Sequence, residues 1–192
     1  MQEYLKRKNL QKIVEKIFKV LEKNYTCVLS IDGNSASGKS TLANELSQFF
    51  DTRIIHLDDF YLPRGVKDLN TSFDGNIDLK RFKKEIIDKL FDDSLTYRAF
   101  SCKEQKIVSS SNLSKKELTI VEGSYSLNPY FGKYYDLSIF IKISEETQLK
   151  RLKERNKDNY LDFINKRVVL ENRYNSHYGI EKSAMLVINN DN

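Results

Sequence analysis

A glycine-rich loop that ends in a lysine and a hydroxyl residue is the segment of this chain with the clearest chemistry. Residues 33–40 read G-N-S-A-S-G-K-S, which is the P-loop pattern G-x-x-x-x-G-K-[ST]. Gly33 and Gly38 let the backbone turn so that successive N–H groups point inward at phosphate oxygens. Lys39 would reach the β- and γ-phosphates, and the Ser40 hydroxyl would bind Mg²⁺. The predicted nucleotide-binding residues are Gly33, Asn34, Ser35, Ala36, Ser37, Gly38, Lys39, Ser40 and Thr41.

The residues around this loop stand in the order that gives the pattern its meaning. An apolar run, C-V-L-S-I at 27–31, leads into the loop, and K-S-T-L-A at 39–43 opens a helix. The start of that helix adds a positive dipole end to the site. A glycine- and serine-rich turn could match by accident, but strand, loop and helix together favour a bound nucleoside triphosphate.

Two adjacent carboxylates follow the short strand that is expected at 53–57. Asp58 is a candidate general base for an acceptor hydroxyl, and Asp59 is a candidate Mg²⁺ ligand through water. Since neighbouring residues that leave a strand point opposite ways, we expect only one of them to face the phosphate. The plainer alternative is a surface turn with two acids.

Further charged residues stand where phosphate chemistry would use them. Glu122 ends the apolar run 118–121 in a position like that of a Walker-B acid, which holds Mg²⁺ directly or through water. Arg151 and Arg155 lie one helical turn apart and suit a lid that stabilises the transferred phosphoryl group. The alternatives are an acid bonded to a helix N-terminus and a solvated basic helix face.

Strands and helices alternate along the chain. We expect an N-terminal helix within 1–24, helices at 39–50 and 78–90, and a charged helical region at about 145–175 that is interrupted near 156–159. Core strands are expected at 27–31, 53–57, 118–121, 137–143 and 185–188, and a two-stranded excursion at 95–100 and 105–109 followed by a loop at 110–114. The core strands are continuous apolar runs, which predicts an α/β fold with a parallel sheet covered on both faces.

Composition limits the classes of function. The 192 residues form one domain, and the net charge is +5 with a pI near 9.0. Basic residues are spread along the chain, so we expect an anionic small-molecule partner rather than nucleic acid. Cys27 and Cys102 are predicted to be free thiols. With no long apolar run and no apolar signal segment, we expect a cytoplasmic protein without membrane contact, and a homo-oligomer is compatible with the sequence.

From Thr26 to the C-terminus the chain resembles the uridine kinase family. That family includes uridine/cytidine kinases, phosphoribulokinases, bacterial pantothenate kinases and nicotinamide riboside kinases. The resemblance is carried by the P-loop and by five further matches: H-L-D-D-F-Y at 56–61, N-I-D-L-K-R-F at 76–82, I-V-E-G-S-Y at 120–125, Y-Y-D-L at 134–137 and the Arg151/Arg155 pair. Of these, the D-[DS]-F-Y element after a strand is the most specific.

The resemblance implies a kinase that uses Mg²⁺ and ATP, with a three-layer P-loop NTPase fold, a five-stranded, mainly parallel sheet and a helical lid. It places Asp58 at the acceptor hydroxyl as general base and Tyr61 in the substrate pocket. Asp74 would bind ribose and Tyr97 would line a base pocket. Arg151 and Arg155 would be lid arginines.

The chain departs from the family pattern at two places. S-F-D-G-N-I-D at 72–78 replaces the usual D-H-P-x-A-F/I-D, and C-K-E-Q at 102–105 stands where a histidine usually reads the pyrimidine. The favoured acceptor is the 5′-hydroxyl of uridine or a related nucleoside, and the alternatives are pantothenate, nicotinamide riboside or a sugar. The basic pI motivates a further alternative, a nucleotide-dependent switch or nucleic-acid-associated ATPase.

Overall fold

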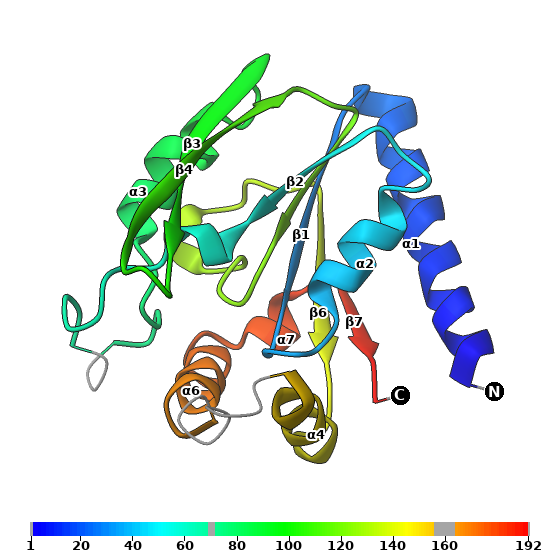
Figure 1. Cartoon of the computed structure of the whole chain (residues 1–192). Coiled ribbons are helices and arrows are strands. Elements are labelled where there is room, and N and C mark those ends of the chain that lie inside the picture. Colours follow the sequence, from blue (N-terminus) through cyan, green and yellow to red (C-terminus); the bar gives the residue numbers. More distant parts are fainter. Residues whose placement is uncertain (1, 69–71, 156–163, 192) are drawn as a thin grey trace.

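A five-stranded parallel sheet forms the centre of the molecule in the computed structural model, which describes residues 2–68, 72–155 and 164–191 (Figure 1). The strand order is β2-β5-β1-β6-β7, and each neighbouring pair is parallel. This sheet confirms the predicted α/β fold class. The strands are β1 (Cys27–Gly33), β2 (Thr52–His56), β5 (Leu118–Glu122), β6 (Leu137–Lys142) and β7 (Leu186–Asn189).

Helices and a hairpin cover the two faces of the sheet. On one face, α1 (Gln2–Asn24) and α2 (Lys39–Leu46) contribute Ile13, Ile17 and Leu46 to a buried cluster with Leu29 and Ile31 of β1. A second cluster on the other face joins Val28 and Val121 to α3 (Leu79–Glu85) and to β3 (Ser94–Ser101). Burial of both faces explains why the core strands are continuous apolar runs.

The polar elements around the site lie at the carboxyl ends of the strands. They include α4 (Glu145–Arg155), a π-helical turn η4 (Ile164–Val168), α6 (Val169–Tyr178) and α7 (Ile180–Ser183). Figure 1 shows α4 and α6 below the P-loop end of β1, and the N-terminal turns of α1 near the end of β7. The predicted interruption near 156–159 lies outside the described residues.

Some boundaries differ from the sequence-based expectations. The second strand of the excursion, β4 (Lys106–Ser114), extends through the serine-rich segment that was expected to be a loop, because Ser110 and Ser114 pair with Arg98 and Ser94 of β3. Most of β4 is exposed, so its polar composition is compatible with a strand. The helix expected at 78–90 ends at Glu85, and a short 3₁₀ turn, η2 (Ile87–Lys89), follows.

Two further 3₁₀ turns, η1 (Leu57–Phe60) and η3 (Pro129–Phe131), complete the described elements. Cys27 is buried, Cys102 is exposed, and both are free thiols. In the part of the chain that the structure describes, no helix combines the length and the apolar character needed to cross a membrane.

Candidate active site

The P-loop leaves the end of β1 through two glycines that no other residue could easily replace. Gly33 has φ 146°, and a Cβ there would collide with the carbonyl oxygen of Ile141 on β6. Gly38 has φ 97°, and a Cβ there would lie 2.7 Å from Nδ2 of Asn190. Both positions therefore combine a left-handed backbone with a close neighbour, which explains the glycines of the motif.

Every backbone carbonyl from residue 33 to residue 37 accepts a hydrogen bond from a side chain. The bonds are Lys39 Nζ to Gly33 and Asn34 (3.0 and 2.9 Å), Gln148 to Ser35 (3.1 Å), Arg151 to Ala36 (3.1 Å) and Asn190 to Ser37 (2.7 Å). Because these partners hold the carbonyls, the loop keeps the conformation in which its N–H groups can face an anion. The N–H groups of Ser35 and Ser37 are themselves bonded within the protein.

Glu171 of α6 is the buried partner of the first half of the loop. Its carboxylate accepts from the N–H of Ser35 at 2.7 Å, from the Ser35 hydroxyl at 2.5 Å and from the Ser124 hydroxyl at 3.0 Å. Glu171 is only 3% exposed. The N–H and hydroxyl of Ser35 thus bind α6, while its carbonyl binds α4, so this residue ties both helices to the loop.

Two neighbours of Glu171 extend this attachment. Asn172 accepts from the side chain of Asn34 at 2.9 Å, and the Tyr174 hydroxyl donates to Asp32 at 2.9 Å. Asp32 also accepts from the N–H groups of residues 33, 125 and 127, and its burial raises its pKa to about 6. Asp32 is therefore a buried hydrogen-bond acceptor directly before the loop.

Ser40 and Glu122 meet at the start of α2. The Ser40 hydroxyl donates to Glu122 Oε1 at 3.0 Å, and His56 Nδ1 lies 2.5 Å from the same oxygen. His56 and Glu122 are register partners on β2 and β5, which brings them together. The hydrogen bond to Glu122 raises the pKa of His56. A hydroxyl and a carboxylate beside a phosphate loop fit Mg²⁺, which binds few protein oxygens and completes its shell with phosphate and water.

Asp58 and Asp59 point to different surroundings. Asp58 lines a pocket of about 320 Å³ together with P-loop residues and Glu122, and its side chain is 64% exposed. The carboxylate of Asp59 instead accepts from the Tyr97 hydroxyl at 3.0 Å, and burial raises its pKa. The two residues diverge from a 3₁₀ turn, η1, rather than from a strand.

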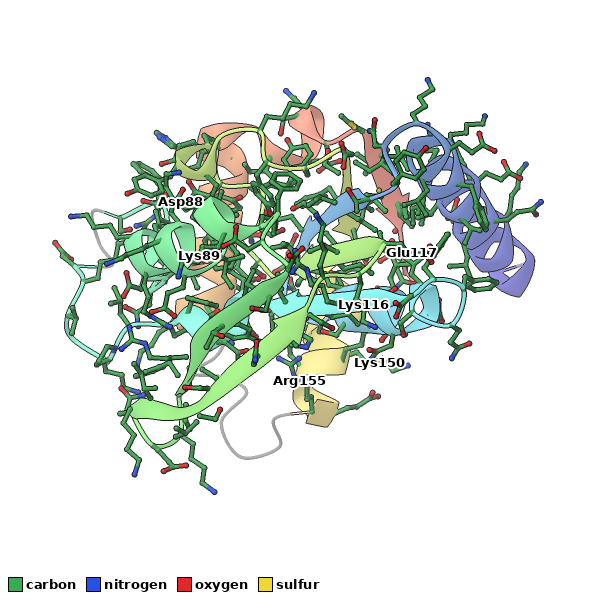
Figure 2. The ribbon with its side chains drawn as sticks, turned by 90° about the horizontal axis from the view of Figure 1, so that it is seen from above. Asp88, Lys89, Lys116, Glu117, Lys150 and Arg155 are labelled. Carbon is green, nitrogen blue, oxygen red and sulfur yellow. The ribbon has the colours of Figure 1, made fainter. Side chains whose placement is uncertain are left out.

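Three arginines line the same pocket: Arg151, Arg155 and Arg167. The guanidinium of Arg151 binds the carbonyls of Ala36 and Asn190, at 3.1 and 2.8 Å, so it supports the loop backbone. Arg155 lies in the last turn of α4, where Figure 2 labels it. Arg167 lies 3.8 Å from Asp58, and its guanidinium is 4.3 Å from the centre of the Tyr61 ring. The pocket thus joins cationic groups to the candidate base.

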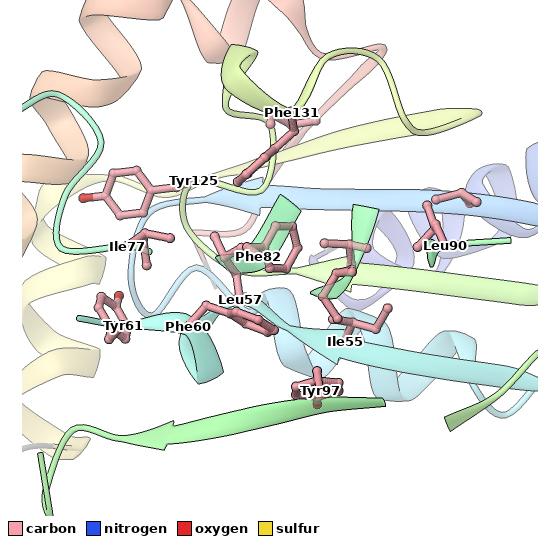
Figure 3. Packing of buried hydrophobic residues seen from close by; sticks show 14 of the residues in the cluster. Ile55, Leu57, Phe60, Tyr61, Ile77, Phe82, Leu90, Tyr97, Tyr125 and Phe131 are labelled. Carbon is pink, nitrogen blue, oxygen red and sulfur yellow. The ribbon is translucent and has the colours of Figure 1, made fainter. Parts of the chain in front are cut away.

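The expected acceptor residues lie in three different environments. Tyr61 is buried beside this pocket, and its hydroxyl has no hydrogen-bond partner among the described residues. The carboxylate of Asp74 accepts from Asn128 at 2.7 Å and from the Tyr178 hydroxyl at 3.1 Å. Tyr97 lies in the core cluster, 5.4 Å from Phe60 between ring centres (Figure 3).

Sequence reasoning missed several residues that hold the loop. Asn190 follows the last strand of a parallel sheet, a position where ligand-side residues gather, so it could have been found. Gln148 and Glu171 lie in charged helical sequence with no pattern that distinguishes them, and only the fold brings them to the P-loop. Arg167, which lies near Asp58, was missed for the same reason.

No family model matches the chain. Over 97 residues it is 36% identical to a tRNA dimethylallyltransferase of Oenococcus oeni, a match that covers 50% of this chain and 37% of that protein. Over 123 residues it is 31% identical to uridine-cytidine kinase D of Dictyostelium discoideum, covering 59% of this chain and 23% of that protein. The chain thus spans well under half the length of either relative.

Solved structures match the chain along nearly its whole length. A protein of Bacillus stearothermophilus described as a possible uridine kinase has a TM-score of 0.69 at 21% identity, covering 94% of this chain and 99% of that one. A D-glycerate 3-kinase of Cryptococcus neoformans has a TM-score of 0.61 at 13% identity, covering 86% and 87%. The chain therefore shares its fold with these two proteins.

Proposed function

We propose that this chain is an ATP-dependent small-molecule kinase that transfers the γ-phosphoryl group to a primary hydroxyl. The favoured acceptor is the 5′-hydroxyl of uridine or a related nucleoside. The observation that carries the proposal is a single pocket lined by Lys39, Ser40, Glu122, Asp58 and three arginines. A kinase needs a carboxylate that accepts the proton of the acceptor hydroxyl, and Asp58 lines the same pocket as the phosphate loop.

The donor half of the reaction rests on the P-loop. Lys39, whose ammonium group now binds the loop carbonyls, would pair with the β- and γ-phosphates. Ser40 and Glu122 would hold Mg²⁺, which supplies charge neutralisation at the phosphate oxygens when bound. Asp59 was a candidate for this metal site, but its carboxylate binds Tyr97, and the proposal gives it no metal ligand role.

The acceptor half rests on Asp58. As the acceptor oxygen forms its bond to the γ-phosphorus, the bond to the β-phosphate oxygen breaks and ADP leaves. The hydroxyl proton passes to the Asp58 carboxylate and from there to solvent. Arg155 and Arg167 line the pocket and would stabilise the charge on the transferred group. Arg151 would act mainly through the loop backbone that it holds.

Two observations favour a second candidate, a kinase for another small metabolite. Asp74, the expected ribose ligand, already binds Asn128 and Tyr178, and Tyr97 is buried in the core. The fold is also shared with a D-glycerate 3-kinase. Pantothenate, nicotinamide riboside, sugars and glycerate are therefore acceptors to test beside the nucleosides.

The test measures ADP release from Mg-ATP against this acceptor panel, with Lys39→Ala as the blank. Turnover with uridine or cytidine alone would support the favoured acceptor, and turnover with another compound would support the second candidate. One further reaction contains RNA in place of an acceptor, because of the partial match to a tRNA-modifying enzyme. ATP hydrolysis that depends on RNA and on no small acceptor would contradict the kinase proposal.

A further inference from the structure

A second, larger cavity borders the P-loop, and Asp58 does not line it. Its volume is about 610 Å³, within the range of small-molecule sites. It is enclosed by the N-terminal helix α1, by α2, and by the residues that end β7. Figure 1 shows the same arrangement, with the N-terminal turns of α1 beside the end of β7 and α2 between α1 and β1.

The cavity adjoins the phosphate pocket. Ala36, Gly38, Thr41 and Arg151 line both of them. A ligand whose phosphates lie on the P-loop can therefore extend past Thr41 into the second cavity. The chemical group that follows the phosphates in a nucleoside triphosphate is a ribose with a flat heterocyclic base.

The cavity is lined by apolar side chains from both the helices and the sheet: Leu10 and Ile13 of α1, Leu42 of α2, and Ile141 and Ile188 of the sheet. Polar residues complete the lining: Asn9, Thr41, Glu45, Arg151 and residues 189–191. Apolar side chains combined with a smaller set of polar groups are typical of sites that bind an aromatic ring.

The position of α1 at this cavity is fixed by the core. Ile13 and Ile17 are buried in the cluster shared with β1 and α2, with 2% and 0% of their surfaces exposed. Leu10, one turn before Ile13, is only partly buried and reaches the cavity. Asn190 fixes the opposite rim, since its side chain binds Ser37 and its carbonyl accepts from Arg151.

We propose that α1 forms the outer wall of the donor nucleobase site, with Leu10 and Ile13 against the base, and that it determines which nucleoside triphosphates bind. This inference rests on the proposed function, because it assigns the nucleotide phosphates to the P-loop. It gives the N-terminal helix, which lies outside the sheet and its loops, a direct part in ligand selection.

The experiment compares two probes by titration calorimetry: Mg-ATP, and inorganic tripolyphosphate with Mg²⁺, which has no base. The variant Leu10→Trp places a larger side chain at the cavity. Leu21→Trp is the matched control, because Leu21 is also partly buried on α1 but does not line the cavity. Thermal unfolding verifies that both variants are folded.

We expect Leu10→Trp to weaken Mg-ATP binding about ten-fold or more, while tripolyphosphate binding changes less than about two-fold. Leu21→Trp should change neither affinity. Equal losses of affinity for both probes would overturn the inference, because α1 would then act through the P-loop. An unchanged affinity for ATP would also overturn it. If Leu10→Trp does not fold, Leu10→Ala takes its place, with a several-fold loss expected for ATP alone.

The outcome separates the two proposals. If the wild-type chain binds neither probe, the proposed function and this inference both fail. If it binds both probes and Leu10→Trp has no selective effect, only the role of α1 fails. Titration of the wild type with other nucleoside triphosphates then measures the base preference that the wall provides.

Discussion

Glu171 of α6 and Ser35 of the P-loop are joined by two hydrogen bonds, one from the Ser35 N–H and one from its hydroxyl. They lie 136 residues apart in sequence. The contact attaches one residue of the phosphate loop to α6. A buried carboxylate at this position fixes the loop and connects its conformation to α6.

Replacing this carboxylate by an amide tests its positioning role. In Glu171→Gln, one oxygen can still accept from the hydroxyls, but the NH₂ group would face the Ser35 N–H. We expect a loss of stability of about 1–3 kcal/mol and weaker ATP binding. Urea unfolding and titration with ATP measure the two effects.

The control for this variant is Glu181→Gln on α7, whose carboxylate pairs with Lys142 at the surface. Surface pairs contribute little, so Glu181→Gln should change neither quantity by more than about 1 kcal/mol. If Glu171→Gln were less stable but bound ATP normally, Glu171 would have a structural role alone.

The neighbouring acids on η1 provide a matched pair of variants. Asp58→Asn should lower turnover about 10²- to 10⁴-fold because the base is lost, with ATP affinity nearly unchanged. Asp59→Asn should retain most of its turnover and lose about 1 kcal/mol of stability, since it weakens the bond from Tyr97. Steady-state kinetics on both variants decides the assignment, and the reverse ranking would move the role of base to Asp59.

The metal assignment predicts a changed requirement for magnesium. Ser40→Ala and Glu122→Gln should each raise the Mg²⁺ concentration needed for half-maximal turnover by roughly ten-fold or more. The measurement is turnover against Mg²⁺ at saturating ATP. Asp59→Asn serves as the control, and an unaltered Mg²⁺ curve in both test variants would show that the ion is held by other groups.

The pKa of His56 should show whether its hydrogen bond to Glu122 forms, without any measurement of activity. The hydrogen bond that His56 donates to Glu122 raises the His56 pKa above its ordinary value of 6.5. The stability that this pair contributes is fully present below about pH 6.5 and is lost as the pH rises through the raised pKa. In Glu122→Gln the His56 pKa should fall, and NMR titration can follow it easily because the chain has two histidines. An unchanged His56 pKa would show that this contact does not form in solution.

Local sequence patterns were sufficient for the parallel sheet and for the P-loop, because each depends on a short run of residues. The core strands could be recognised as runs of apolar residues. The P-loop could be recognised because its motif requires glycines at fixed positions. The second half of β4, residues 110–114, was expected to be a loop because serines are typical of loops, and only its pairing with β3 shows that the strand continues there.

The support of the loop could not be predicted in the same way. Gln148, Asn190 and Glu171 bind P-loop atoms across more than 100 residues of sequence, and nothing near them in the chain indicates that contact. Tyr97 was expected at a base pocket from a family resemblance; its ring lies in the core cluster and its hydroxyl donates to Asp59. Long-range packing determines the positions of such side chains, whereas the motif predicts only the conformation of the loop itself.

Transfer of label from γ-labelled ATP tests the kinase proposal most directly. The purified chain is incubated with Mg²⁺ and each acceptor, and the products are separated. The account predicts a labelled, phosphorylated acceptor that is absent with Lys39→Ala and strongly reduced with Asp58→Asn. Label that appears only as inorganic phosphate, at the same rate with and without every acceptor, would contradict it.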